Sequence, residues 1–243
     1  MRQFSGKRYW LVGASEGLGA ALAEALSRAG AEVILSARNE VGLQAVASGL
    51  PGPSKCQPVD VTDADSVRRA ADAIGPVDGV VYLAAVYWPM PAVRWQAEQA
   101  TAMADVNFTG ALRVLGAVVP DMVARDSGHI VITGSLGGFR GLPGAIGYAA
   151  SKAGVMSLAE SMYYDLRKTG VDIQLVNAGY IRTRLSDKNT IPMPFIMEPE
   201  VAADRMLSHM SSSRFSTSFP TVFSWLFRIS RFLPQWLYFR LFA

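Results

Sequence analysis

Short apolar runs alternate with longer amphipathic segments along most of the chain. The runs that we interpret as β-strands are 9–12, 33–36, 57–59, 77–83, 129–133, 171–176 and 215–219. The segments with helical spacing are 20–28, 41–48, 63–74, 98–119, 147–168 and 201–210. Strands that alternate with helical crossovers in this way favour an α/β fold over a barrel or a sandwich.

The run 77–83 is nearly continuous in apolar residues, which is typical of a strand covered on both faces of its sheet. We therefore predict a doubly wound parallel sheet in a Rossmann-like three-layer α/β/α arrangement. The chain has no internal repeat and no obvious linker, so we expect a single domain. We assign 1–219 to this Rossmann-type domain and 220–243 to a helical C-terminal tail.

Composition narrows the class of protein further. Half of the 243 residues (50%) are hydrophobic and only 18% are charged, which excludes disorder as the main state. Cys56 is the single cysteine, so we interpret it as a small strand-borne hydrophobe and expect no disulfide. His129 and His209 are the only histidines, and we expect no metal site. The polar segment 1–7 does not resemble a secretory signal, so we expect a cytoplasmic protein.

The charge of the chain is unevenly distributed. Its formal net charge is +3, but Asp204 is the last acidic residue, so the 39 residues after it carry +5 and the first 204 carry −2. The same stretch holds ten of the 24 aromatic residues. Arg228, Pro234 and Arg240 interrupt it, whereas a spanning helix needs about 20 predominantly apolar residues.

Three interpretations of the tail remain open. Its apolar residues recur at helical spacing, which suits a helix packed on the domain or on a second subunit. The mixture of aromatic residues and arginines also suits an interfacial helix on anionic lipid, with possible peripheral membrane contact. A third role is closure over a hydrophobic substrate.

Glycines mark the first junction between a strand and a helix. Gly13-Ala14-Ser15-Glu16-Gly17-Leu18-Gly19 follows the first predicted strand and opens the first predicted helix. Glycines allow a sharp turn there and a close approach of a phosphate to the backbone, and the helix N-terminus offers unpaired N–H groups. The spacing predicts a nucleotide-binding turn.

The end of the second predicted strand indicates the type of nucleotide. NAD sites commonly place an acidic residue there, whereas an arginine accommodates the 2′-phosphate of NADP. This chain has Ser36-Ala37-Arg38-Asn39, with no acid before Glu40. We expect Arg38, helped by Ser15, to favour NADP(H) over NAD(H), although a solvated surface arginine is the alternative.

A tyrosine and a lysine at helical spacing supply candidate chemistry. Tyr148 and Lys152 lie four residues apart, one turn from each other on a helix. A phenol has an ordinary pKa near 10, and a nearby ammonium lowers it toward the range useful in proton transfer. Ser135, at the end of the preceding strand, lies where open α/β sheets present their ligands.

With these motifs in this order, residues 7–205 resemble the short-chain dehydrogenase/reductase family. The motifs that carry the resemblance are the cradle Gly13–Gly19, Asp60-Val61, Asn107-Phe-Thr-Gly110, Ser135, Tyr148 with Lys152, and Asn177-Ala-Gly179 continuing to Thr183. In this family a Tyr–Lys spacing of four is typical of carbonyl and alcohol chemistry. The resemblance implies an NADP-dependent oxidoreductase that acts as a dimer or tetramer.

The resemblance also implies a role for each site residue. Tyr148 is expected to be the general acid/base, and Ser135 to hydrogen-bond the substrate oxygen. Lys152 is expected to hold the nicotinamide ribose and tune Tyr148, with Asn107 supporting a water relay to it. The residues expected to bind the cofactor are Gly13, Ser15, Glu16, Gly17, Leu18, Gly19, Arg38, Asp60, Val61, Ala84, Tyr148, Lys152, Ile181 and Thr183. The apolar segment 184–200 is the expected lid over a hydrophobic ketone or acyl-type substrate.

The chain departs from the family pattern at three places. Val12 stands where the family usually has Thr, and Ala178-Gly179 replaces Pro-Gly. The fourth strand ends in Tyr82-Leu-Ala-Ala85 rather than Asn-Asn-Ala-Gly, which removes a polar bracing residue.

Competing functions are judged against the same residues. The changed fourth strand leaves a cofactor-sensing binding protein as an alternative. A serine hydrolase is disfavoured because Ser135 lacks the G-x-S-x-G elbow. Nucleic-acid binding is disfavoured because the arginines of the tail alternate with bulky apolar residues.

Overall fold

The computed structural model describes residues 1–189 and 191–242, so Thr190 of the predicted lid and Ala243 of the predicted tail lie outside the described residues. Seven parallel strands form one sheet in the order β3-β2-β1-β4-β5-β6-β7. The strands are β1 Arg8–Val12, β2 Glu32–Ser36, β3 Ser54–Cys56, β4 Gly79–Tyr82, β5 Gly128–Ser135, β6 Val171–Ala178 and β7 Ser216–Phe219. The predicted doubly wound parallel sheet is confirmed.

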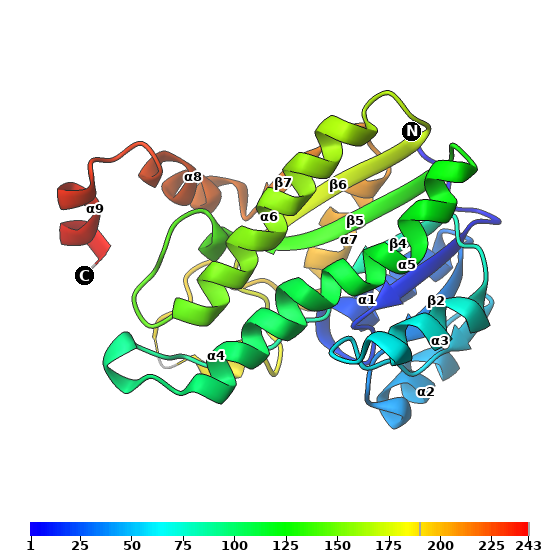
Figure 1. Ribbon diagram of the computed structural model, residues 1–243, viewed down its shortest axis with the longest axis horizontal. Coiled ribbons are helices and arrows are strands. Elements are labelled where there is room, and N and C mark those ends of the chain that lie inside the picture. The colour runs from blue at the N-terminus through cyan, green and yellow to red at the C-terminus, as the bar shows by residue number, and fades with distance from the viewer. Residues whose placement is uncertain (190, 243) are drawn as a thin grey trace.

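Helices cover both faces of this sheet (Figure 1). The helices are α1 Gly17–Arg28, α2 Glu40–Ser48, α3 Ala64–Ile74, α4 Ala97–Ala104, α5 Gly110–Ala124, α6 Ile146–Leu166 and α7 Pro199–Met210, followed by α8 Thr221–Ser230 and α9 Gln235–Phe242. Short 3₁₀ turns lie at Ala92–Arg94, Leu136–Gly138 and Ser186–Lys188.

Two apolar cores separate the three layers. Trp10 and Val12 of β1 join the core formed with α3, α5 and α6, whereas Tyr9 and Leu11 join the core formed with α1, α2 and α7. Adjacent residues of one strand therefore point into opposite cores, as the geometry of a strand requires. Burial on both faces explains why the strand sequences are nearly continuous in apolar residues.

The third strand lies earlier than the sequence pattern predicts. We expected it at 57–59, but the ladder with β2 is formed by Ser54–Cys56. The chain still follows β2 beyond this point, because the Gln57 and Val59 amides donate to Leu35 and Ala37 at 2.9 and 3.1 Å. The Gln57 carbonyl accepts a hydrogen bond from the Ser36 hydroxyl at 2.5 Å, and the regular ladder ends at Cys56, so the predicted position was wrong.

The predicted helix at 98–119 is interrupted by a wider turn. A π-helical segment, Asp105–Thr109, separates α4 from α5 and contains the buried Asn107. By length and composition the continuous stretch Ala97–Ala124, 28 residues long, is apolar enough to cross a membrane. In the fold it packs on the sheet through Val106, Ala111 and Val114, which accounts for its apolar residues as a core-helix face.

Candidate active site

The carboxyl ends of the central strands open into one cavity of about 1190 Å³. This is the edge at which open parallel sheets present ligands, because the loops that follow the strands diverge there. Every cofactor or catalytic residue that we predicted lines this cavity except Asn107. The fold therefore brings together seven segments that are far apart in the sequence.

The glycine-rich turn leaves no room for side chains. A Cβ on Gly13, whose φ is +103°, would lie 2.5 Å from the Ala84 amide nitrogen, and a Cβ on Gly19 would lie 2.0 Å from the Gly13 carbonyl oxygen. Gly17 has a φ of +55° and approaches the Thr183 side chain. Glu16, which precedes α1, makes no capping hydrogen bond, so the first N–H groups of α1 face the cavity without a side-chain cap. Such a cradle fits a pyrophosphate.

The cradle is linked to the segment that follows β6. Glu16 pairs with Arg184 at 2.5 Å, and both side chains are largely exposed. Further along this segment, Lys188 donates to the Tyr87 carbonyl at 3.0 Å, and the Tyr87 hydroxyl donates to Asn189 at 3.0 Å. The predicted lid therefore lies across the cavity and contacts both sides of it.

Charged groups stand where we expect the adenine end of a dinucleotide. Arg38 is exposed at the cavity wall. Burial by itself raises the pKa of the Asp60 carboxyl, but hydrogen bonds from Thr62 and the charges of Arg38 and Arg113 outweigh it, so the pKa lies below its ordinary value. Asp60 is held ionised, with one oxygen accepting both Thr62 donors at 2.9 and 2.7 Å.

Ser135, Tyr148 and Lys152 line the same cavity. Ser135 ends β5, and the other two lie on the first turns of α6. The Lys152 ammonium donates to the Thr133 carbonyl at 2.9 Å and lies 5.9 Å from the centroid of the Tyr148 ring. The Ser135 hydroxyl oxygen accepts a hydrogen bond from the Gly137 amide at 3.1 Å, which fixes its position.

Burial shifts both titratable groups of this set. Burial raises the pKa of the Tyr148 phenol, and the nearby Ser135 hydroxyl partly offsets that effect. Burial also lowers the pKa of Lys152 to about 8. Because each shift disfavours the charged form, the tyrosine is a protonated phenol at neutral pH and the lysine is close to its titration range.

Asn107 lies behind the cavity wall rather than in it. It is fully buried, and its side chain pairs with both backbone groups of Val86, accepting from the amide at 2.7 Å and donating to the carbonyl at 3.0 Å. It also donates to the Ser151 hydroxyl at 3.0 Å. These contacts connect the π segment to the loop after β4 and to α6 beside Lys152; the predicted water relay stays a prediction.

Comparison with known proteins identifies the family. The sequence profile described as short chain dehydrogenase matches residues 7–192. A Myxococcus xanthus protein (strain DK1622) described as an uncharacterized oxidoreductase is 38% identical over 245 residues, covering 98% of this chain and 97% of its own. This chain belongs to the short-chain dehydrogenase family. It is an oxidoreductase, and its family binds nicotinamide cofactors.

Solved structures share the fold of this short-chain dehydrogenase. One from Streptomyces avermitilis matches with a TM-score of 0.84 at 23% identity, covering 93% of each chain. An actinorhodin polyketide ketoreductase with NADPH matches with a TM-score of 0.80 at 23% identity, covering 90% of this chain and 97% of its own. At such identity these matches show the shared architecture.

The changed end of the fourth strand carries a polar contact of its own. Tyr82 is buried, and its hydroxyl donates to the Val106 carbonyl of the π segment at 2.6 Å. Gly110 makes room for that hydroxyl, since a Cβ there would lie 2.5 Å from it. This short-chain dehydrogenase therefore braces the π segment with a tyrosine in place of the polar residue usual in the family.

Several cavity residues escaped the sequence analysis. Tyr87 packs edge-on against Tyr148, with ring centroids 5.1 Å apart. The ring centroids of Tyr180 and of Phe223 in α8 lie 6.2 Å apart, and both side chains line the cavity. Tyr180 was recognisable in principle, because it stands between the Asn177-Ala-Gly179 motif and Ile181. Phe223 was not, because only the tertiary fold brings α8 to the cavity.

Proposed function

We propose that this oxidoreductase transfers a hydride between NADP(H) and a carbonyl or secondary alcohol of a hydrophobic substrate. The observation that carries the proposal is that Ser135, Tyr148 and Lys152 line the same cavity as the glycine cradle. The nicotinamide cofactor, when bound, supplies or accepts the hydride. The protein supplies the proton and stabilises charge on the substrate oxygen.

Tyr148 and Ser135 act on the same substrate oxygen. In the reducing direction the protonated phenol of Tyr148 donates its proton to that oxygen as negative charge develops. The Ser135 oxygen accepts from the Gly137 amide, and its hydroxyl interacts with the Tyr148 phenol. A substrate oxygen that lies between the two hydroxyl groups would receive the Ser135 hydrogen bond in place of the phenol. Two hydrogen-bond donors on one oxygen stabilise the negative charge that develops there while a carbonyl is reduced to an alcohol.

Lys152 stabilises the phenolate form of Tyr148 after proton transfer. One of its three N–H groups is held by the Thr133 carbonyl, which aims the ammonium along the cavity wall. A cation near a phenolate favours the ionised form, so the Lys152 ammonium would stabilise the Tyr148 phenolate that proton transfer leaves behind. The remaining donors are available to ribose hydroxyl groups.

The proposed preference for NADP(H) rests on Arg38. No acidic side chain precedes Glu40 at the end of β2, so the ribose 2′ position would meet a guanidinium and the Ser15 hydroxyl at the cavity wall. A guanidinium suits a phosphate because it combines charge with paired donors.

The proposed hydrophobic substrate rests on the cavity wall around Tyr148. Tyr87, Tyr180, Phe223 and Leu226 line the same cavity, and the Tyr87 ring packs against that of Tyr148. Walls of this kind bury apolar surface and leave only a few polar groups to orient the ligand. A lipophilic ketone or acyl-type carbonyl compound fits this distribution.

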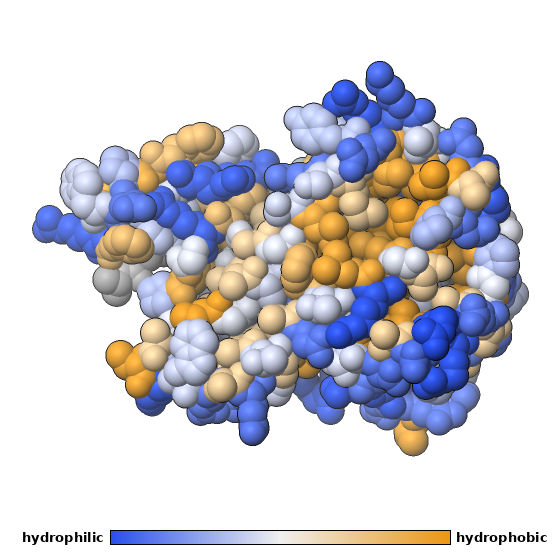
Figure 2. All heavy atoms as spheres, viewed as in Figure 1, coloured by the Kyte–Doolittle hydropathy of each residue, from blue (hydrophilic) through white to orange (hydrophobic). Residues whose placement is uncertain are grey.

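A homo-oligomer, dimer or tetramer, is part of the proposal. Figure 2 shows apolar side chains gathered between and over α5 and α6. Large apolar residues of these helices are exposed, among them Leu112, Val123, Tyr163 and Tyr164. Exposed apolar patches commonly mark subunit contacts. A cytoplasmic location stays a prediction.

The test of the function is hydride transfer to a panel of ketones of increasing chain length, with NADPH and NADH compared. We expect turnover that favours NADPH and lipophilic ketones, and we expect Tyr148→Phe to abolish it while cofactor binding is retained. Cofactor binding without turnover of any ketone would contradict the proposal and support the cofactor-sensing alternative.

A further inference from the structure

Helix α8 has its polar and apolar faces reversed. Its buried positions are Ser224, Phe227 and Ser230, whereas Trp225 and Ile229 are 55% and 54% exposed. Each buried serine hydroxyl donates to a carbonyl three residues earlier in the same helix, at 2.7 and 2.8 Å. A helix that faces water normally turns serines outward and tryptophan inward, so another apolar medium must cover this face.

The exposed apolar residues continue through the rest of the tail. Val222 and Leu226 of α8, Phe232 of the connection and Trp236, Phe239 and Leu241 of α9 are all more than half exposed. We call the exposed residues Val222, Trp225, Leu226, Ile229, Phe232, Trp236, Phe239 and Leu241 the tail face. Figure 1 shows that α8 and α9 extend away from the sheet. Exposure of so much apolar surface marks an interaction site.

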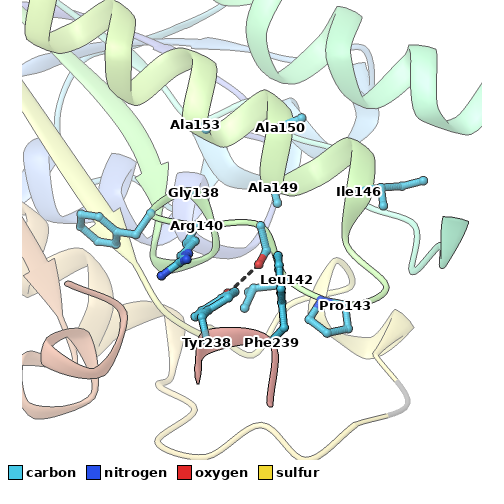
Figure 3. A pocket seen from close by; sticks show the side chains of 12 residues that line it. Gly138, Arg140, Leu142, Pro143, Ile146, Ala149, Ala150, Ala153, Tyr238 and Phe239 are labelled. Carbon is cyan, nitrogen blue, oxygen red and sulfur yellow. Dashed lines mark hydrogen bonds between the residues drawn. The ribbon is translucent and has the colours of Figure 1, made fainter. Parts of the chain in front are cut away.

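Polar contacts hold α9 in this orientation. Tyr238 is buried, and its hydroxyl donates to the Gly141 carbonyl while the Arg140 guanidinium stacks 3.9 Å from its ring centroid (Figure 3). Arg140 also donates to the Leu233 carbonyl at 3.0 Å and to that of Ser230. The tail is thus fixed to the body through Tyr238 and Arg140. Phe239 lines the cavity between α9 and α6, and the residues of the tail face remain more than half exposed.

The charged side chains of the tail itself all have one sign. Every charged residue after Asp204 is an arginine. Arg231 and Arg240 are exposed beside the tail face, and neither forms an ion pair within residues 1–189 and 191–242. Aromatic residues, above all tryptophan, together with arginines are the composition that binds at the surface of an anionic bilayer.

The cavity of the candidate active site reaches the same face. Leu226 belongs both to the tail face and to the cavity wall, and Ile191 of the lid, 56% exposed, lines the cavity as well. A second cavity of about 620 Å³ lies between α9 and α6 and shares Leu142 and Pro143 with the first (Figure 3). An apolar molecule held at the tail face would therefore lie beside the entrance to the site.

We propose that the tail face docks on an anionic lipid surface and that the substrate enters the cavity from that surface. The helices lie in the interface, with the aromatic residues among the headgroups and acyl chains and the arginines near the phosphates. The docking step stands on the tail alone, whereas substrate entry from the bilayer also rests on the proposed function. A second copy of this chain is the competing occupant of the tail face.

The experiment is co-sedimentation of the full chain with vesicles of phosphatidylcholine, with and without phosphatidylglycerol. We expect binding to the mixed vesicles and little binding to phosphatidylcholine alone. The variant Trp225→Gln/Ile229→Gln/Phe232→Gln should reduce binding by about tenfold or more, because it removes buried apolar area from the docked helix. The matched control, Val41→Gln/Val93→Gln, changes residues that are 80% and 91% exposed elsewhere and should bind as the unchanged chain does.

Charge is tested separately with Arg231→Gln/Arg240→Gln. Loss of two cations should weaken binding to the anionic vesicles and flatten its dependence on salt, because screening acts on those charges. Absence of binding by the unchanged chain, or equal binding by the triple glutamine variant, would overturn the proposal. A triple variant that only reduces the oligomer mass in light scattering would assign the tail face to a subunit contact instead.

Ketone turnover distinguishes failure of membrane docking from failure of the proposed oxidoreductase function. None of Trp225, Ile229 and Phe232 lines the described cavities, so the triple variant should turn over a water-soluble ketone at the unchanged rate. It should lose turnover only of a ketone presented in the vesicles. Vesicle binding in a protein that reduces no ketone would leave docking intact and remove the function.

Discussion

Tyr82 shows how one residue alters the neighbourhood of the site. Its hydroxyl bonds the Val106 carbonyl, and the residue after that carbonyl is Asn107, whose side chain holds the loop that follows β4. The phenol is buried, and burial raises its pKa, so it stays a neutral donor at any working pH. Tyr82 thus connects the end of β4 to the π segment and, through Asn107, to the loop that follows β4.

We predict that Tyr82→Phe destabilises the protein. The change leaves the buried Val106 carbonyl without its donor, which costs about 1–3 kcal/mol in the free energy of unfolding. Denaturant unfolding checks this, with Tyr164→Phe as the control because that residue is 67% exposed. Equal stability of the two variants would mean that the π segment does not depend on Tyr82.

Arg38 carries the second prediction at this scale. Arg38→Gln should weaken NADPH binding relative to NADH by about 10–100-fold, because a hydrogen bond to a charged group contributes about 1.5–3 kcal/mol. The measurement is the ratio of kcat/KM for the two cofactors. Arg28→Gln, at the far end of α1, is the control and should leave the ratio unchanged. An unchanged ratio in Arg38→Gln would show that Arg38 is a solvated surface residue.

At the scale of an element, the glycines of α1 and α5 differ in the space around them. Gly19 lies in the first turn of α1, where a Cβ would come within 2.0 Å of the Gly13 carbonyl oxygen. Gly116 lies exposed in α5 with no atom within 4 Å of an added Cβ. The first glycine is required by the close approach of two backbone segments, and the second only adds flexibility to the unfolded chain.

We therefore predict opposite signs for two alanine substitutions. Gly19→Ala should displace the cradle, lower stability and weaken cofactor binding, since neither backbone segment can move without disturbing the sheet. Gly116→Ala should stabilise the protein by about 0.5–1 kcal/mol, because alanine is the better helix former. Thermal unfolding and cofactor titration measure both effects. Tight cofactor binding by Gly19→Ala would contradict the assignment of Gly13–Gly19 as the cradle.

Element boundaries also show what a linear pattern can and cannot reveal. The helices after β1, β2 and β5 were predicted within a few residues, because each is a continuous stretch with several good helix formers such as alanine and leucine. β3 was misplaced because its regular ladder is formed by Ser54–Cys56, a segment without an apolar run, and the π segment was missed because its residues keep helical spacing. Both errors involve hydrogen bonds, which residue types specify only indirectly.

At the scale of the whole molecule, the end of the sheet opposite the cavity holds a buried histidine. His129 begins the buried part of β5, and its ring contacts the Tyr9 hydroxyl at 2.9 Å and the Arg2 guanidinium at 3.0 Å. Burial, together with the charge of Arg2, lowers the pKa of His129 to about 3. Burial also lowers the pKa of His209.

We predict that stability falls as the pH drops below about 6.5, the ordinary pKa of histidine. Between that value and about 3, the unfolded chain binds a proton on His129 that the folded chain does not. Each such histidine then removes up to about 1.4 kcal/mol of unfolding free energy per pH unit. The loss is absent at higher pH, where both states are neutral.

Urea unfolding at several pH values from about 7.5 down to about 4.5 measures this slope. The range stays above the ordinary pKa of aspartate, so the depressed pKa values of Asp60 and Asp78 contribute little in it. His129→Gln keeps hydrogen-bonding capacity without titrating, and it should show a shallower slope. A flat profile in the unchanged chain would show that His129 binds a proton as readily in the fold as in the unfolded chain, which contradicts the lowered pKa.

The amino-acid sequence by itself determined the fold class, the glycine cradle and the set Ser135, Tyr148 and Lys152. These features depend on periodicity and on short spacings, which are properties of neighbouring residues along the chain. The strand-end positions of the set then followed from the rule that open parallel sheets bind ligands at their carboxyl edge.

Only the tertiary structure decided what surrounds that set and where the tail faces. Tyr87 packs against Tyr148 and Phe223 packs against Tyr180, each pair from distant segments, and no local signal marks such contacts. The spacing in α8 showed which residues share a face, but not which face turns toward the body. The inward serines and the outward Trp225 and Ile229 follow from how α8 docks beside β7, because periodicity specifies relative and not absolute orientation.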